Sequence, residues 1–164
     1  MSLPRASDIA YMDAGSSGGS TYRGKRVAVI SGQGATRVLL ASESGALVLF
    51  DRAAGIIYTL PTPVAGMEFE FQNTVTITSN NAKVITAAAT QFLLGTVNVV
   101  INTSATTLAA LGNGTTHVAL TSNGTTTGGV QGDHYKLIAI SPTQWAITGI
   151  VSGSGAIATP FTTS

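Results

Sequence analysis

Cysteine is absent from this 164-residue sequence, and charged residues are few. The lack of cysteine excludes disulfides, thiolate metal sites and cysteine nucleophiles. Only 9% of the residues are Asp, Glu, Lys or Arg, against about 25% in an average soluble domain. The formal net charge is +1, so bulk electrostatics give no reason to expect a nucleic-acid partner.

No charged residue occurs between Lys83 and Asp133, where Thr, Ser, Asn and Gly supply the polarity. A soluble monomer usually keeps charge on its surface, which limits association. One interpretation is a Thr-rich β-domain whose outer faces are neutral. The other is that further subunits cover much of this surface, because charge is depleted in the core of protein contacts. We favour the second interpretation.

Long apolar runs are also absent. Mean hydropathy is +0.34, yet runs such as residues 96–101 end well short of the ~20 residues that a membrane-spanning helix needs. The first twelve residues contain no apolar stretch typical of a secretory signal. We therefore expect synthesis in the cytoplasm without export, and no membrane partner.

The sequence predicts one domain preceded by an arm. Residues 1–25 are expected to form a flexible N-terminal arm, because residues 13–26 are rich in Gly and Ser. Residues 26–164 are expected to form the domain, with a Gly/Ser/Thr-rich tail at residues 152–164 in which Ile157 and Phe161 are possible anchors. The arm is either a tail without a role or a segment that docks on a partner. In the second case its contact candidates are Arg5, Ile9, Tyr11, Arg23, Lys25 and Arg26.

Short β-branched and aromatic runs separated by turns predict strands throughout the domain. In residues 67–72 the apolar side chains alternate with Glu68, Glu70 and Gln72, so period two places Phe69 and Phe71 on one face. Residues 134–140 and 145–151 predict a hairpin around a Ser-Pro-Thr turn. Trp145 and Ile147 share one face of its second strand, and Gly149 leaves room there for a large neighbour. The core candidates are Phe69, Phe71, Trp145 and Ile147.

Two Asn-Gly pairs, Asn113-Gly114 and Asn123-Gly124, are strong signals for type I′ hairpin turns. They predict a meander whose middle strand covers residues 115–121. The fold class expected from these patterns is all-β, a single antiparallel β-sandwich or barrel of jelly-roll type.

Candidate chemistry is sparse. Glu68 and Glu70 lie about 7 Å apart on one strand face, which suits either a carboxylate pair or, as we favour, the solvated side of a strand. His117 and His134 are the only histidines, and neither belongs to a metal-binding spacing. No Gly-x-Ser-x-Gly elbow is present. We expect no catalytic, cofactor-binding or metal site, and hence no enzyme.

Three aromatic residues offer the one remaining ligand hypothesis. Tyr58, Tyr135 and Trp145 could stack on sugars if they were exposed. We favour the alternative that the tryptophan is buried in the core of its hairpin.

Residues 60–71, LPTPVAGMEFEF, resemble an LPxPxxGxxFxF segment that is common in virion proteins of tailed bacteriophages. Residues 132–138, GDHYKLI, and 144–149, QWAITG, are similar to the closing hairpin of that module, in which a GDxxxLI run precedes a WxVxG run. Residues 44–57 resemble its entry strands. The similarity extends from about residue 36 to residue 151.

Such modules occur in capsid decoration (cement) proteins, head fibres and tail spikes. A short chain with one module resembles the decoration proteins most. The resemblance implies a structural protein on the outer capsid surface of a virion, made in the host cytoplasm. Its implied partners are the major capsid protein and its own copies, often as a trimer. The alternative is a head-fibre or tail receptor-binding domain that contacts host glycans.

Overall fold

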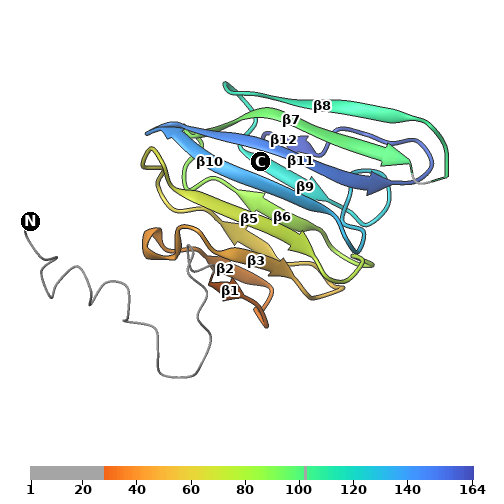
Figure 1. The fold of residues 1–164 in the computed structure, drawn as a ribbon, viewed down its shortest axis with the longest axis horizontal. Coiled ribbons are helices and arrows are strands. Elements are labelled where there is room, and N and C mark those ends of the chain that lie inside the picture. Colours follow the sequence, from red (N-terminus) through yellow and green to blue (C-terminus); the bar gives the residue numbers. More distant parts are fainter. Residues whose placement is uncertain (1–27, 102) are drawn as a thin grey trace, which may run out of the picture.

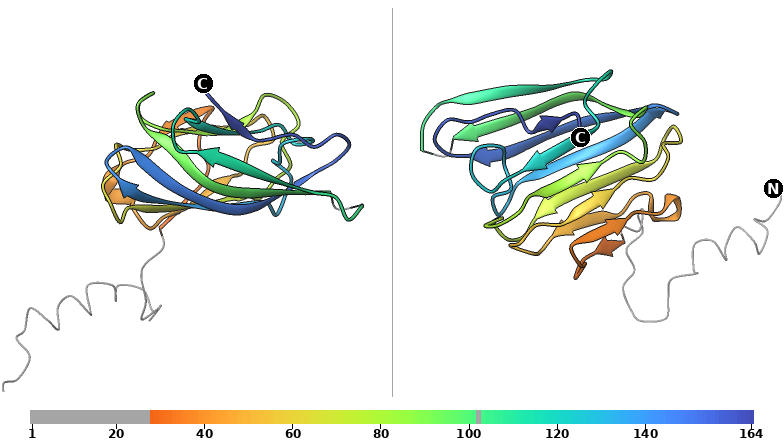
Figure 2. Two further views of the ribbon diagram at one scale, coloured as in Figure 1. Left: turned by 90° about the horizontal axis from the view of Figure 1, so that it is seen from above. Right: turned by 180° about the vertical axis from the view of Figure 1, so that it is seen from behind.

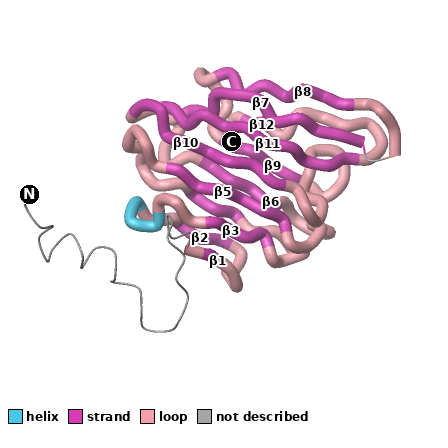
Figure 3. Tube along the Cα trace, in the orientation of Figure 1, coloured by secondary structure: helices cyan, strands magenta, loops and turns pink. Residues whose placement is uncertain are grey.

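The computed structural model describes residues 28–101 and 103–164, and these fold into two β-sheets with one short 3-10 turn, η1 (Ala41–Glu43) (Figures 1 and 3). The large sheet has the strand order β1 (Val29–Ile30), β3 (Leu47–Phe50), β5 (Glu68–Asn73), β10 (His134–Ser141), β11 (Gln144–Gly153), β7 (Phe92–Ile101), β8 (Thr107–Asn113). The small sheet has the order β12 (Phe161–Thr162), β9 (Ala119–Ser122), β6 (Ala82–Ile85), β4 (Ile57–Thr59), β2 (Thr36–Val38). Seen from above, the sheets form two layers (Figure 2, left), which confirms the expected all-β sandwich.

The pairing within the sheets is mixed, whereas the sequence predicted an antiparallel arrangement. From β1 to β6 successive strands alternate between the two sheets, so β1, β3 and β5 are parallel neighbours, as are β2, β4 and β6. Parallel neighbours need a crossover connection, and here the strand in the opposite sheet is part of each crossover. The antiparallel prediction was wrong because the turns carry the chain across to the opposite sheet instead of back along the same sheet.

The centre of the large sheet combines a predicted hairpin with a parallel pairing that no local pattern indicated. β10 and β11 pair antiparallel, with Leu137 opposite Ile147 and Tyr135 opposite Gly149. β11 also pairs with β7 in parallel over its full length. The hairpin therefore lies at the centre of the large sheet. Its strand β10 pairs with β5, and its strand β11 pairs with β7, which in turn pairs with β8.

The core lies between the sheets and is rich in aromatic rings. Phe69, Phe71 and Trp145 are 0% exposed and Ile147 is 3% exposed, which places all four core candidates inside. The ring of Phe71 stacks on that of Tyr135 with centroids 5.4 Å apart, and Phe69 lies 6.1 Å from Trp145. Aromatic pairs of this kind add about 0.5–1.5 kcal/mol beyond their burial.

The two Asn-Gly pairs do not form a meander. β8 belongs to the large sheet and β9 to the small sheet, so each pair begins a loop that leaves its strand. The Asn113 Oδ1 atom accepts hydrogen bonds from the backbone N–H groups of Thr115, Thr116 and His117. The meander prediction was therefore wrong. The Asn side chain fixes the conformation of the loop, but it does not determine which sheet the next strand joins.

The tail predicted at residues 152–164 contributes to the fold. β11 continues to Gly153, Ile157 packs against the core, and Phe161 is 4% exposed. β12 pairs antiparallel with β9. Both apolar residues of this segment thus anchor it.

Candidate interaction surface

The outward side of the large sheet divides into a charged half and an uncharged half. On β5 and β10 the outward side chains include Glu68, Glu70, His134 and Lys136. On β11, β7 and β8 none of the outward side chains is charged. We call this second half the uncharged face. Its outward residues include Ala146, Thr148, Ile150 and Ser152 on β11, Leu94, Thr96, Asn98 and Val100 on β7, and Thr107, Ala109, Leu111 and Asn113 on β8.

The carboxylates of the charged half are paired with bases on the neighbouring strand. The Lys136 Nζ atom lies 2.8 Å from Glu68 Oε2, and the His134 Nε2 atom lies 2.6 Å from Glu70 Oε1. Exposed pairs of this kind contribute about 0–1 kcal/mol each. This geometry fits the solvated strand side that we favoured over a catalytic carboxylate pair.

Strand register makes the uncharged face continuous. Ala146 lies between Ile138 of β10 and Leu94 of β7. One row further along, Thr148 and Thr96 continue to Leu111 on β8. The first row is uncharged across four strands and ends at Asn113 on β8, and the second row is uncharged from β11 to β8, with Lys136 opposite Thr148 on β10.

Several large aliphatic side chains on or beside this face are open to solvent. Leu111 is 61% exposed, Ile150 is 59% exposed and Leu94 is 37% exposed. Ile138 and Ile140 border the face on β10 at 37% and 47%. Contiguous exposed apolar surface marks interaction sites in soluble proteins. This face is the feature of the described residues best suited to binding another protein.

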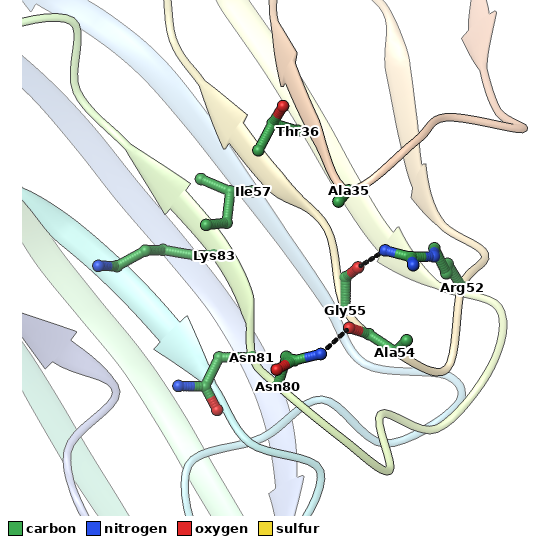
Figure 4. Close-up of a pocket in the computed structure, with 9 residues that line it drawn as sticks. All are labelled: Ala35, Thr36, Arg52, Ala54, Gly55, Ile57, Asn80, Asn81 and Lys83. Atoms are coloured by element: carbon green, nitrogen blue, oxygen red, sulfur yellow. Dashed lines mark hydrogen bonds between the residues drawn. The ribbon is translucent and has the colours of Figure 1, made fainter.

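A pocket at one end of the small sheet offers little chemistry (Figure 4). It has a volume of about 420 Å³, and its cationic side chains are engaged by backbone carbonyls. Arg52 donates to the oxygen of Gly55 at 3.1 Å, and Lys83 donates to the oxygen of Ser164 at 2.6 Å. Asn80 donates to the oxygen of Ala54 at 3.3 Å. The lining holds neither a carboxylate nor a histidine that could act as an acid or base.

The two histidines lie apart and serve local structure. His117 Nδ1 accepts the Asn113 N–H at 3.2 Å, and its ring stacks on Phe161 with centroids 5.6 Å apart. His134 is the partner of Glu70. Within residues 28–101 and 103–164, no group of three or more His, Asp or Glu side chains could hold a metal ion.

Asp133 is a buried carboxylate whose role the sequence did not reveal. It is 2% exposed. Its Oδ2 atom accepts the N–H groups of Gly129 and Val130 at 2.7 and 3.0 Å, and its Oδ1 atom accepts the N–H of Ser152 at 2.7 Å. These bonds tie the loop before β10 to β11. The aspartate of the GDHYKLI segment is therefore a structural anchor. Its presence in that segment was the only signal for it in the sequence.

The three aromatic residues considered for sugar stacking are all buried. Tyr58 and Trp145 are 0% exposed and Tyr135 is 1% exposed, because each projects inward between the sheets. The stacking hypothesis was wrong for these residues, and the alternative of a buried tryptophan is confirmed.

The contact candidates Arg5, Ile9, Tyr11, Arg23, Lys25 and Arg26 lie outside the described residues. No helix in the described part of the chain has the length and apolar character needed to cross a membrane. No protein family, curated protein or solved structure was found to match the chain. Its function is therefore inferred from the sequence motifs and the surface geometry.

Proposed function

We propose that this chain is a non-enzymatic virion protein that binds the outside of a phage capsid and stabilises the shell. The observation that carries the proposal is the combination of the two motif segments into one unit. β5, from the LPxPxxGxxFxF segment, and β10, from the GDxxxLI segment, are adjacent strands, with Phe69 opposite Leu137. Segments about 60 residues apart in the sequence thus lie side by side in one sheet, which supports the proposal.

The uncharged face supports an assembled role. Its side chains are neutral and partly aliphatic, as is typical of surfaces that become the core of a protein contact. The partners in this proposal are the major capsid protein and further copies of the chain, with a trimer as the expected oligomer.

Stabilisation of the shell then follows from mass action. A protein that binds only the assembled shell lowers the free energy of that state relative to the expanded or ruptured shell. At a free concentration 100 times the dissociation constant the effect is about 2.7 kcal/mol per site. Multiplied over the sites of a capsid, such a contribution is large, and it requires no catalytic group.

The test uses capsids assembled without this protein. Purified protein mixed with them should co-sediment and raise the capsid melting temperature in a saturable manner. Capsids of an unrelated phage serve as the control and should show neither effect. The absence of a melting shift at saturating protein would overturn the proposal.

The arm provides a separate prediction. Removal of residues 2–24 should leave a folded domain with weaker capsid affinity, because the proposal assigns docking contacts to Arg5, Ile9, Tyr11 and Arg23. A matched full-length variant, with Lys25→Gln and Arg26→Gln, should lose part of the affinity and part of its dependence on salt. Sedimentation at several salt concentrations measures both. Unchanged affinity after the deletion would show that the arm is dispensable.

The receptor-binding alternative has less support from the structure. It depended on aromatic side chains available for stacking on glycans, and Tyr58, Tyr135 and Trp145 are buried.

A further inference from the structure

We propose that the uncharged face is the surface through which a second copy of this chain binds. This inference deepens the proposed function, because it names the surface used for self-association. Its test contains no capsid, so a failure here and a failure of capsid binding can be told apart.

The charge distribution selects the kind of partner. Burying a charge without a partner costs several kcal/mol, and a face without charged groups provides no partner for one. A protein that covers this face must therefore be uncharged over the same area. The same face on a second copy meets this condition, because β11, β7 and β8 carry no outward charged side chain.

The polar groups of the face also suit contact with themselves. They include the hydroxyls of Thr96, Thr107 and Thr148 and the amide of Asn98. The Ser152 hydroxyl bonds Asp133, and the Asn113 amide is engaged in its own loop. Hydroxyl and amide groups both donate and accept hydrogen bonds. Surfaces of this kind on neighbouring copies can thus satisfy each other's hydrogen bonds, whereas two like-charged surfaces would repel.

The apolar groups supply the driving force. Ile150 and Leu111 expose about three-fifths of their surface, at 59% and 61%. They lie on β11 and β8, and Leu94 lies on β7 between these strands. Removing this surface from water favours association by roughly 25 cal/mol per Å².

The area suits the core of a specific contact. The three strands of the face, at ~4.8 Å spacing and seven to ten residues at ~3.3 Å per residue, span roughly 430 Å² of flat sheet. Projecting side chains raise the accessible area above the flat value. A standard contact takes about 800 Å² from each partner, so the face can supply the core of such a contact and the neighbouring charged half its rim. Sheets that pack face to face do so about 10 Å apart.

The outer side of the small sheet is a poorer candidate. Its strands β2 and β4 have three residues each and β12 has two. Lys83 lies on β6 in the middle of its strand order and reaches the oxygen of Ser164. The charged half of the large sheet carries both signs and therefore suits the rim of a contact, where solvent remains.

The first experiment places a charge on the face. Ile150→Lys and Leu111→Lys change side chains that are largely exposed, so neither should disturb the core. Val64→Lys is the matched control, because Val64 is 58% exposed in the connection between β4 and β5. Sedimentation velocity over a wide concentration range measures the association. The wild type and the control should associate alike, and each face variant should dissociate about 100-fold more readily.

The second experiment uses the absence of cysteine. Ile150→Cys and Val64→Cys each introduce one thiol into a chain that has none. The rate of alkylation at position 150 should fall as protein concentration rises through the association range, while the rate at position 64 stays constant. Circular dichroism verifies that every variant is folded.

Two results would overturn the inference. One is a wild-type chain that stays monomeric at every concentration. The other is association that persists in both charged face variants, with position 150 equally reactive throughout. The second result would place the contact elsewhere, for instance at the open edge of β8.

Discussion

Gly149 lies on the inward side of β11, opposite Tyr135 of β10. A Cβ atom at this position would lie 2.3 Å from the Tyr135 Cβ atom and 2.6 Å from the His134 carbonyl oxygen. No real structure tolerates such contacts without displacement of the backbone. The glycine is therefore required for the stacking of Tyr135 on Phe71, which holds the hairpin against β5.

Gly149→Ala should consequently reduce the free energy of unfolding by about 1–3 kcal/mol or more. Gly34→Ala is the matched control, because nothing lies within 4 Å of its added Cβ atom, and it should be neutral or slightly stabilising. Urea unfolding followed by circular dichroism compares the two. Equal stability of both variants would contradict the packing described for β10 and β11.

The Asp133 carboxyl is the one buried acid among the described residues, and its titration affects stability. Burial raises its pKa, although the N–H groups of Val130, Ser152 and Gly129 act in the opposite direction. A raised folded-state pKa means that the folded chain holds this proton more tightly than the unfolded chain. The stability contributed by the proton is fully present below the unfolded pKa of about 3.9 and is lost as pH rises through the folded pKa.

Asp133→Asn should remove this pH dependence. At low pH the wild-type carboxyl is protonated, but its hydroxyl oxygen can still accept a hydrogen bond where the amide nitrogen of the variant cannot, so the variant's stability there is expected to be lower by about 1–3 kcal/mol. As pH rises from about 4, the gap between the two should narrow, because only the wild type must ionise a buried group. Urea unfolding at a series of pH values measures the gap. A gap that widens with pH would show that the three hydrogen bonds outweigh burial.

At the scale of elements, the two Asn-Gly loops have the same construction. In each, the Asn Oδ1 atom accepts three successive backbone N–H groups and the Asn Nδ2 atom donates to the threonine three residues later. The glycine that follows has a positive φ, +72° for Gly114 and +79° for Gly124, which L side chains rarely adopt. The similar pentapeptides GNGTT and SNGTT thus encode the same loop, which occurs once between β8 and β9 and once between β9 and β10.

Asn123→Ala should cost about 1–3 kcal/mol, because three N–H groups of a half-buried loop lose their acceptor. Asn123→Asp should retain most of the stability, since one carboxylate oxygen can accept the same three bonds and the other can accept from the Thr126 hydroxyl in place of the bond that the Asn123 amide donates. Asn81→Ala, at an exposed position, is the control and should change stability by less than about 0.5 kcal/mol. Thermal melts of the four proteins decide the matter. If the Asp variant were as unstable as the Ala variant, the acceptor role of Asn123 would be refuted.

At the scale of the whole molecule, patterns local in sequence predicted what local physics determines. Alternation in residues 67–72 correctly placed Phe69 and Phe71 inside and the glutamates outside. The β10–β11 hairpin was predictable because one short turn joins its strands. The sheet that each strand joins was not predictable, because the residues of a turn do not indicate whether the chain crosses to the opposite sheet. The parallel pairing of β7 with β11 joins residues about 50 apart and leaves no local pattern.

The same distinction applies to the surface. The absence of charge between Lys83 and Asp133 predicted neutral surface, and β7 and β8 both come from that stretch. That β11 completes the uncharged face could not be predicted, because it depends on the register between β11 and β7. The structural role of Asp133 was equally hidden, since Ser152 and Gly129 approach it only in the folded chain.

The winding of the chain between the two sheets has a kinetic consequence. Each parallel pairing from β1 to β6 joins two strands that are separated in the sequence by a strand of the opposite sheet, and β7 pairs with β11 about 50 residues further along the chain. Folds dominated by such distant contacts lose chain entropy before their contacts form, so they refold in about milliseconds to seconds or more slowly. The single tryptophan, Trp145, is fully buried in this centre and reports its formation.

Stopped-flow dilution from urea should therefore show Trp145 fluorescence changing on the scale of about milliseconds to seconds. The Ile150→Lys variant should refold at the same rate as the wild type at low concentration, because Ile150 projects outward from β11 and takes no part in the core. Gly149→Ala should unfold faster, since its clash with Tyr135 is present in the native pairing of β10 with β11. Complete refolding within microseconds would mean that local contacts dominate, which the long-range pairing of β7 with β11 does not allow.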